Sequence, residues 1–298
     1  MNKAASIKAS LMNIAQKEKR SYQELLQTYV LERVVCRLSV SSFAEMFALK
    51  GGILLYALFD GQFARATADI DLLCEAVSTG KDRIDTIFHQ ILALDMDDGL
   101  VFDPSTVSIA DIAEHNVFPG VRVMAQALLE RTRVPVTIDI GFGDEIVPEH
   151  RKIDFPSLLE GKQHSIRAYS TESVIAEKLE AIASLGFLNS RYKDFFDIYL
   201  LAQHFPFHGE VLVKAVKTTF TNRKTTLYGI AAFGGDFVSD PLHQKRWNAF
   251  IKKKAVFQSK SLLDTINNIR HFIQPVIDAI EKGAVFNRTW DYKEQEWK

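Results

Sequence analysis

Two aspartates separated by a single residue, Asp69 and Asp71, are the clearest candidates for chemistry in this chain. They lie in residues 65–73, where polar and apolar side chains alternate as they do along a β-strand. Successive side chains of a strand point to opposite faces, so that Asp69 and Asp71 would project from the same face. Adjacent carboxylates repel each other unless a cation lies between them. Oxygen ligands suit Mg²⁺, which takes one or two carboxylates together with substrate phosphates.

A third carboxylate, Asp139, lies in residues 134–140, a second segment with the pattern of a strand. If the two strands are neighbours, Asp69, Asp71 and Asp139 converge on one point. Such a cluster is the usual protein contribution to a two-metal site, where one cation activates an attacking hydroxyl and the other stabilises the leaving group. The plainer alternative is a set of solvated acids, with Asp139 forming a turn before Gly141.

Phosphate-binding groups lie close to the aspartates in the sequence. Lys50, Gly51 and Gly52 have the character of a turn from a strand into a helix. Two glycines allow the backbone to approach a ligand closely, and the first N–H groups of a helix can donate to phosphate. Arg65 and Thr67 would share the strand face of the aspartates, so that Arg65 either binds a phosphate or neutralises the carboxylates.

The C-terminal half contributes a lysine and an acid on helices. Lys178 has an apolar residue four positions away on each side, and a lysine on such a stripe either extends its amine to solvent or holds a phosphate in a cleft. Asp194 is followed by two phenylalanines, and an acid beside a packed stripe usually has a partner. Lys193 and Asp197 have the spacing of an ordinary surface ion pair.

These candidates require a mixed α/β domain followed by helices. The first 50 residues have helical periodicity, with possible capping boxes at residues 21–24 and 42–45. Strands are expected at residues 47–49, 65–73, 121–124 and 134–140, and helices at residues 53–59 and 81–95, in a domain that ends near Pro156. Further helices are expected at residues 170–186, 191–204, 209–220 and 261–281, with a glycine-containing loop at residues 229–241.

Composition narrows the class of protein. The 298 residues are 47% hydrophobic and 24% charged, as is usual for a globular protein, and their number suggests two domains, residues 1–160 (with N-terminal helices over residues 1–45) and residues 161–298. The longest apolar stretch, residues 52–59, is far shorter than the about 20 residues that span a bilayer. The N-terminus lacks the apolar core of a signal peptide, and the two cysteines imply no disulfide framework. We expect a cytoplasmic protein without membrane association.

The net charge of −1 conceals a basic segment, residues 211–260. This segment has ten lysines and arginines and two acids, a charge of +8, which leaves −9 for the rest of the chain. A basic block of this kind is typical of a surface that binds a polyanion, although scattered lysines on solvated helices give the same count.

Taken in order, these motifs resemble the AbiEii-like nucleotidyltransferase toxins, which belong to the DNA polymerase β-type superfamily. The resemblance covers about residues 45–205, and the rest of the chain matches only in general character. The motifs that carry it are Lys50-Gly51-Gly52, Arg65-x-Thr67-x-Asp69-Ile70-Asp71, Ile138-Asp139-Ile140-Gly141, Glu177-Lys178-Leu179-x-Ala181 and Arg191-x-Lys193-Asp194-x-x-Asp197.

The resemblance implies a minimal nucleotidyltransferase fold of the α/β (α+β) class, with a mixed sheet, N-terminal helices and a helical C-terminal domain. It implies a toxin of a type IV toxin–antitoxin or abortive phage infection system, with a cognate antitoxin encoded nearby. Such an enzyme would use Mg²⁺ to transfer a nucleotidyl group from a nucleoside triphosphate to an acceptor such as tRNA, releasing pyrophosphate.

The resemblance also implies roles for individual residues. Asp69 and Asp71 would bind metal and act in catalysis, and strand geometry adds Asp139 as a third metal ligand. Lys178 and Asp194 would be catalytic. The expected nucleotide- and phosphate-binding residues are Lys50, Gly51, Gly52, Arg65, Thr67 and Lys193. The superfamily's turn usually reads Gly-Ser, with the serine touching phosphate, so that the Gly-Gly of this chain would have to rely on backbone contacts.

Two other functions remain open. An enzyme of the same superfamily that modifies a small molecule, such as an antibiotic, would have no need of the basic segment, whereas an RNA acceptor would. A non-catalytic nucleotide- or RNA-binding module would have structural acids and no Mg²⁺-dependent nucleotide binding. Charge reversal at residues 252–254 is expected to weaken acceptor binding more than nucleotide binding.

Overall fold

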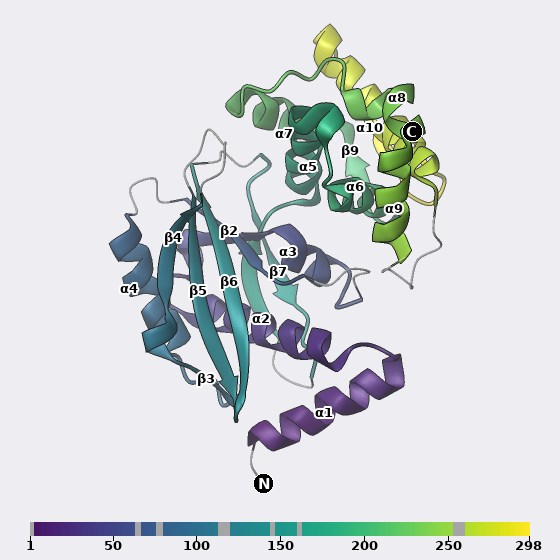
Figure 1. The fold of residues 1–298 in the computed structure, drawn as a ribbon. Coiled ribbons are helices and arrows are strands. Elements are labelled where there is room, and N and C mark those ends of the chain that lie inside the picture. The colour runs from purple at the N-terminus through teal and green to yellow at the C-terminus, as the bar shows by residue number, and fades with distance from the viewer. Residues whose placement is uncertain are drawn as a thin grey trace. The chain divides into compact units, whose positions relative to one another are not determined.

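The computed structural model describes residues 3–62, 67–75, 80–112, 120–143, 147–159, 163–252 and 260–298. The predicted phosphate ligand Arg65 and the cations Lys253 and Lys254 therefore lie outside the described residues. The chain divides into two compact units, which Figure 1 shows in purple to teal and in green to yellow. Unit 1 comprises Met1–Asp144 and Arg151–Ala168, and unit 2 comprises Glu145–His150 and Tyr169–Lys298.

Unit 1 is built on a mixed sheet with the strand order β3-β5-β6-β2-β1-β8-β7, and β4 also pairs with β5. At its centre β2 runs parallel to β6 and antiparallel to β1, which in turn runs parallel to β8. Apolar residues fill most of β2, as suits a strand that is buried on both faces. The strands are β1 (Phe47–Lys50), β2 (Ile70–Cys74), β3 (Leu100–Phe102), β4 (Ser108–Ile112), β5 (Gly120–Leu129), β6 (Thr132–Phe142), β7 (Arg151–Phe155) and β8 (His164–Ala168).

The helices of unit 1 pack on this sheet. α2 contacts β6 and β8, α4 contacts β4 and β5, and the two helices also touch each other. α4 buries Ile84, Ile87, Phe88 and Ile91, the spacing of an amphipathic helix. The helices are α1 (Lys3–Glu18), α2 (Tyr22–Val40), α3 (Gly51–Leu58) and α4 (Lys81–Leu92), with 3₁₀ turns at Ala44–Met46 and Pro104–Thr106.

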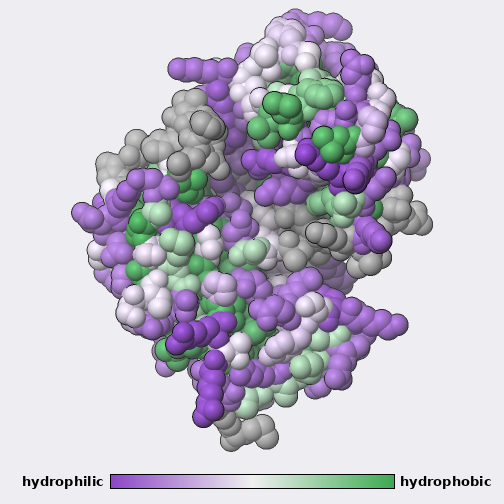
Figure 2. Space-filling view, viewed as in Figure 1, coloured by the Kyte–Doolittle hydropathy of each residue, from purple (hydrophilic) through white to green (hydrophobic). Residues whose placement is uncertain are grey.

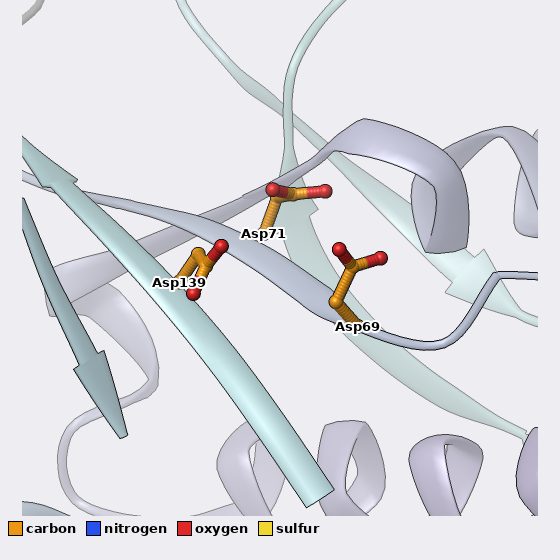
Figure 3. A group of neighbouring side chains, drawn as sticks. All are labelled: Asp69, Asp71 and Asp139. Carbon is orange, nitrogen blue, oxygen red and sulfur yellow. The ribbon is translucent and has the colours of Figure 1, made fainter. Parts of the chain in front are cut away.

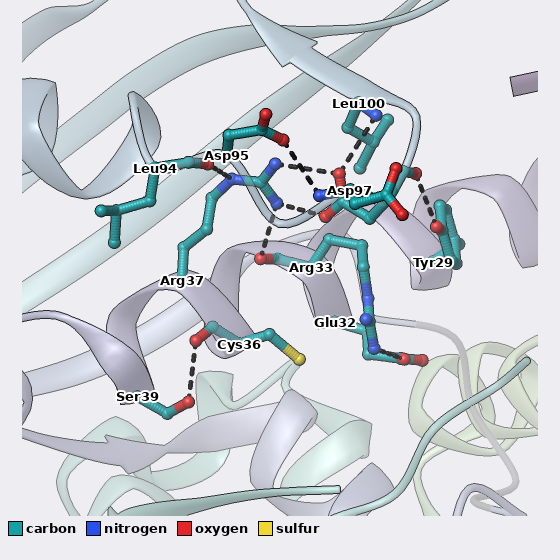
Figure 4. Close-up of polar contacts among 11 residues, drawn as sticks. Tyr29, Glu32, Arg33, Cys36, Arg37, Ser39, Leu94, Asp95, Asp97 and Leu100 are labelled. Carbon is teal, nitrogen blue, oxygen red and sulfur yellow. Dashed lines mark hydrogen bonds and ion pairs between the residues drawn. The ribbon is translucent and has the colours of Figure 1, made fainter. Parts of the chain in front are cut away.

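A buried ion pair fixes α2 to the loop between α4 and β3 (Figure 4). Arg37 is 1% exposed, and its Nη2 donates to Oδ1 of the buried Asp98 at 2.9 Å. The remaining polar atoms are also satisfied, because Arg37 Nε donates to the Leu94 carbonyl at 2.9 Å and the Asp98 carboxylate accepts from the N–H of Leu100 at 3.1 Å. Buried ion pairs are tolerated only with such additional hydrogen bonds.

Unit 2 is mainly helical. α5 and α10 each pack against α6 and α7. A small sheet, β9-β10-β11, joins the C-terminal residues to these helices, and the indole N–H of Trp290 donates to the Ala202 carbonyl at 2.7 Å. The elements are α5 (Thr171–Leu185), α6 (Tyr192–His204), β9 (Phe207–His208), α7 (Gly209–Asn222), α8 (Gly235–Ser239), α9 (Pro241–Lys252), α10 (Leu262–Lys282), β10 (Thr289–Asp291) and β11 (Glu296–Trp297), with 3₁₀ turns at Gly186–Leu188 and Ala231–Phe233.

The predicted fold class is confirmed: a mixed α/β sheet domain with N-terminal helices and a helical C-terminal part. Three local predictions are wrong. Ser21 is the N-cap of α2, but its side chain makes no capping bond, and residues 42–45 begin no α-helix. The segment 229–241 holds α8 as well as turns, because the fully buried Phe237 anchors it to the core.

The surface is mainly hydrophilic, as expected for a globular protein of this composition. Hydrophilic residues cover most of the face that Figure 2 shows, between separate apolar patches. Within the described ranges, no helix is both long and apolar enough to cross a membrane.

Candidate active site

Three carboxylates meet at the centre of the unit 1 sheet (Figure 3). Asp71 of β2 lies directly opposite Asp139 of the parallel strand β6, and Asp69 comes two residues before Asp71. Oxygen atoms of all three carboxylates lie within 4.8 Å of one another, and the three residues are half-buried. The expectation that the two strands are neighbours is thus met, and it is this pairing that brings Asp139 to the other two.

Asp69 lies just outside its strand. The ladder between β2 and β6 starts at Ile70, so that the strand predicted from residue 65 begins five residues later than expected. The hydroxyl of Thr67 donates to the Asp69 carboxylate at 3.1 Å and to the Asp69 carbonyl at 3.2 Å. Local bonds of this type hold the backbone in a turn and compete with ladder formation. The hydroxyl of Thr67 therefore orients Asp69, and the predicted contact of Thr67 with phosphate stays a prediction.

Gly51 makes room for Asp71. Lys50 lies opposite Asp71 in the β1–β2 ladder, and the chain then turns into α3 through Gly51, whose φ is +68°. A Cβ atom on Gly51 would lie 1.8 Å from Oδ2 of Asp71. Glycine is therefore required at position 51 for two reasons: the left-handed backbone and the close approach of a carboxylate. The same turn places the start of α3, with its free N–H groups, beside the acids.

An arginine that the sequence analysis missed engages the third carboxylate. Arg122 of β5 lies opposite Asp139, and its Nε and Nη2 donate to Oδ1 and Oδ2 of Asp139, each at 2.7 Å. Arg122 is 44% exposed and Asp139 is 19% exposed. No motif could have pointed to Arg122, because its role depends on the register between β5 and β6 rather than on its sequence neighbours.

The donor set fits a hard divalent cation. Three carboxylates within 4.8 Å supply oxygen ligands only, which is the chemistry that Mg²⁺ prefers. Because Gly51 has no side chain, one oxygen of Asp71 lies close to the start of α3. The backbone N–H groups at this helix start favour an anionic group. A cation and a phosphate can therefore be held next to each other by this part of unit 1.

The predicted residues Lys178 and Asp194 meet in unit 2, between α5 and α6. Lys178 Nζ lies 3.1 Å from Oδ1 of Asp194 and 2.7 Å from Oδ2 of Asp197, and both acids are at most 1% exposed. Asp197 faces the core and contacts Lys178, whereas Lys193 is exposed on α6, and the predicted contact of Lys193 with phosphate stays a prediction. Asp197 is therefore the residue that sequence reasoning undervalued.

A second ion-pair network lies nearby on α5. Arg223 contacts Glu180 at 2.9 Å and Glu177 at 3.0 Å, and the Thr225 hydroxyl donates to Glu180 at 2.6 Å. Arg223 was counted among the ten cations of the basic segment. Its charge is taken up inside unit 2, so that it adds little to a polyanion-binding surface.

Removing Lys178 should destabilise unit 2. Lys178→Met would remove this cation from the buried carboxylates of Asp194 and Asp197, of which Asp194 keeps Arg191 Nε at 2.8 Å, and breaking a buried pair costs about 3–5 kcal/mol. We expect the melting temperature, followed by circular dichroism, to fall by roughly 6–20 °C. Lys193→Met is the matched control, since Lys193 is exposed on α6 and its loss should leave the melting temperature almost unchanged. Equal melting temperatures for the two variants would contradict the buried-pair assignment.

The geometry of unit 1 defines a class of protein. A carboxylate cluster on adjacent strands, next to a glycine turn that opens a helix, is the arrangement of enzymes that transfer phosphoryl or nucleotidyl groups. Residues 33–272 match the model of a family described as nucleotidyl transferase AbiEii toxin, type IV TA system. The chain therefore belongs to the AbiEii family and is a nucleotidyltransferase, which confirms the resemblance drawn from its motifs.

Solved structures agree on the fold. A crystal structure from H. pylori, described as that of a candidate nucleotidyltransferase, is similar over 89% of this chain and 100% of its own, with a TM-score of 0.51 and 18% identity. MenT4, a nucleotidyltransferase toxin from Mycobacterium tuberculosis H37Rv, is similar over 92% of this chain and 98% of its own, with a TM-score of 0.53 and 12% identity. A comparison with curated proteins finds no match.

Proposed function

We propose that this chain uses Mg²⁺ to transfer a nucleotidyl group from a nucleoside triphosphate to RNA, with tRNA as the first acceptor to test. We further propose that it acts in the cytoplasm as the toxin of a phage-defence system, held in check by an antitoxin encoded nearby. The observation that carries the enzymatic part is the convergence of Asp69, Asp71 and Asp139 within 4.8 Å.

The three carboxylates are the proposed metal ligands. Bound there, Mg²⁺ would activate the acceptor hydroxyl and hold the triphosphate. The chain's own groups then position the reactants: the first N–H groups of α3, after Gly51 and Gly52, donate to phosphate oxygens, and Thr67 keeps Asp69 oriented. Positioning and charge neutralisation supply most of the catalysis in such transfers.

Other groups have proposed roles at the nucleotide. Arg65, Lys50 and Lys193 would contact phosphates, and Lys193 is exposed on α6 as such a contact requires. Lys178 and Asp194 keep their proposed catalytic role, with Asp197 as the acid that orients the Lys178 amine at 2.7 Å.

The basic segment supports a polyanionic acceptor. After Arg223 is set aside, its described cations include Lys245, Arg246 and Lys252 of α9, all exposed. Lys245 and Lys252 are seven residues apart, so that they lie on the same side of the helix. A small-molecule acceptor gives no reason for such a surface, whereas RNA phosphates do.

Reversing the charge of this helix face should affect the acceptor selectively. Lys245→Glu combined with Lys252→Glu is expected to weaken tRNA binding and to lower its log–log salt slope by about 2, with little change in nucleotide binding. Filter binding of tRNA over a salt series would measure both effects. Lys282→Glu with Lys293→Glu, two exposed lysines outside the segment, is the control of equal charge. Parallel losses of tRNA and nucleotide binding would count against an acceptor role for α9.

A transfer assay tests the function as a whole. The protein is incubated with each α-³²P-labelled nucleoside triphosphate, Mg²⁺ and total tRNA, beside the variants Asp69→Asn and Asp154→Asn. Asp154 is an exposed acid of β7 and serves as the control. Label on RNA with the native protein and Asp154→Asn, but not with Asp69→Asn, would support the proposal. Label on a protein or a small molecule would overturn the RNA acceptor, and no label anywhere, together with no Mg²⁺-dependent nucleotide binding, would overturn the proposed mechanism.

A further inference from the structure

We propose that Arg122 and a divalent cation compete for Asp139, so that Arg122 sets the affinity of the third carboxylate for metal. The inference rests on the proposed function, because it takes the carboxylate cluster to be a metal site. It concerns a residue of β5 to which none of the motifs assigns a role.

The competition follows from the hydrogen bonds of Asp139. Arg122 donates to both of its oxygens at 2.7 Å, a bidentate geometry that uses one lone pair of each oxygen. An oxygen of Asp139 also belongs to the group of ligand atoms that lie within 4.8 Å of one another. A cation bound among all three acids therefore either shares Asp139 with the guanidinium and is repelled by its charge, or displaces one of its N–H groups.

Asp139 is the acid of the cluster that Arg122 engages through both oxygens. Asp69 accepts a hydrogen bond from the neutral hydroxyl of Thr67, which leaves that carboxylate its full charge. Competition with Arg122 therefore acts at Asp139, and it would lower the affinity of a cation that depends on this carboxylate.

The free-energy cost of weakening the ion pair between Arg122 and Asp139 should be small. Arg122 is 44% exposed, and ion pairs at such exposure change an equilibrium constant by no more than about five-fold. A divalent cation with three carboxylates nearby outweighs a contribution of this size. Arg122 would then tune the affinity of this cation without preventing its binding.

Mn²⁺ binding, measured from the electron paramagnetic resonance signal of free Mn²⁺ at constant ionic strength, tests the proposal without reference to activity. In Arg122→Gln we expect Mn²⁺ to bind about five-fold more tightly than in the native protein. Arg122→Lys keeps the charge but loses the bidentate hydrogen bonding to Asp139, so that it should show a smaller increase in Mn²⁺ affinity. Arg133→Gln is the matched control, because Arg133 is exposed and shares the face of β6 with Asp139, six residues away.

A double-mutant cycle links the effect to Asp139. In the Asp139→Asn background, Arg122→Gln should no longer change Mn²⁺ affinity. Unchanged or weaker binding in both single variants of Arg122, each confirmed to be folded by its melting temperature, would overturn the inference while the metal site itself stands. If neither the native protein nor any variant bound Mn²⁺, with or without nucleotide, the proposed function would fall as well.

Discussion

Asp71→Asn is expected to abolish nucleotidyl transfer while unit 1 stays folded. Asp71 is the acid that joins the cluster, because it lies opposite Asp139 and two residues after Asp69. Its amide replacement keeps the shape but removes the charge that would balance a cation. Loss of a single electrostatic group costs about a hundred- to a thousand-fold in rate, and loss of a proposed metal ligand should cost at least as much. The transfer assay with labelled triphosphate measures the loss, and Asp69→Asn should behave in the same way.

Thermal stability distinguishes a catalytic role of Asp71 from a structural one. If Asp71 serves catalysis, its neutral variant should melt within a few degrees of the native protein, a difference of about 1 kcal/mol. Asp154→Asn provides the reference for a strand aspartate outside the cluster. An inactive variant that has also lost its β-sheet circular dichroism would show that the acid supports the fold, and the catalytic assignment would have to be withdrawn.

Gly51→Ala should be almost as damaging as loss of the acid itself. Alanine at a φ of +68° costs about 1–2 kcal/mol in backbone strain, and its Cβ would lie 1.8 Å from Asp71 Oδ2. Because that contact is impossible, either the carboxylate or the start of α3 has to move. Displacement of reacting groups by about 1 Å can reduce a rate a hundred-fold. We expect transfer to fall by at least that factor, together with weaker Mn²⁺ binding.

Gly229→Ala separates the effect of backbone strain from the effect of the collision with Asp71. Gly229 has a similar φ of +63°, and no atom lies within 4 Å of the position that its Cβ would take. This control carries the backbone strain without the collision, and it should lose some stability but keep transfer activity and Mn²⁺ affinity. Equal losses of activity in the two variants would mean that general destabilisation, not the loss of space for the Asp71 carboxylate, explains the effect at Gly51.

The sequence predicted the parts of the fold that depend on local patterns. The helices α4, α5 and α10 have clear apolar periodicity, and their bounds agree with expectation to within a few residues. The strands β3, β4, β7 and β8 were not predicted, because each is no longer than five residues and is defined by its partner strand. α9 escaped notice because only His243 and Trp247 of its residues are buried, too few to give a periodic signal.

The candidate site shows the same division. Asp69, Asp71 and Asp139 could be grouped because strand alternation and one assumed pairing sufficed. Arg122 and Asp197 could not, since their partners Asp139 and Lys178 are set by the β5–β6 register and by the packing of α5 on α6. Charges that neutralise one another across elements leave no trace in the spacing of a sequence.

The parallel pairing of β2 with β6 also bears on how the protein acquires its toxicity. The chain between these strands contains α4, β3, β4 and β5, and contacts between residues so far apart in sequence form slowly, after the intervening segments are ordered. Asp71 and Asp139 therefore come together only when most of unit 1 has folded. If the three carboxylates are the active site, as proposed, a newly synthesised or partly unfolded chain cannot carry out the transfer, and its toxicity would begin only after unit 1 has folded.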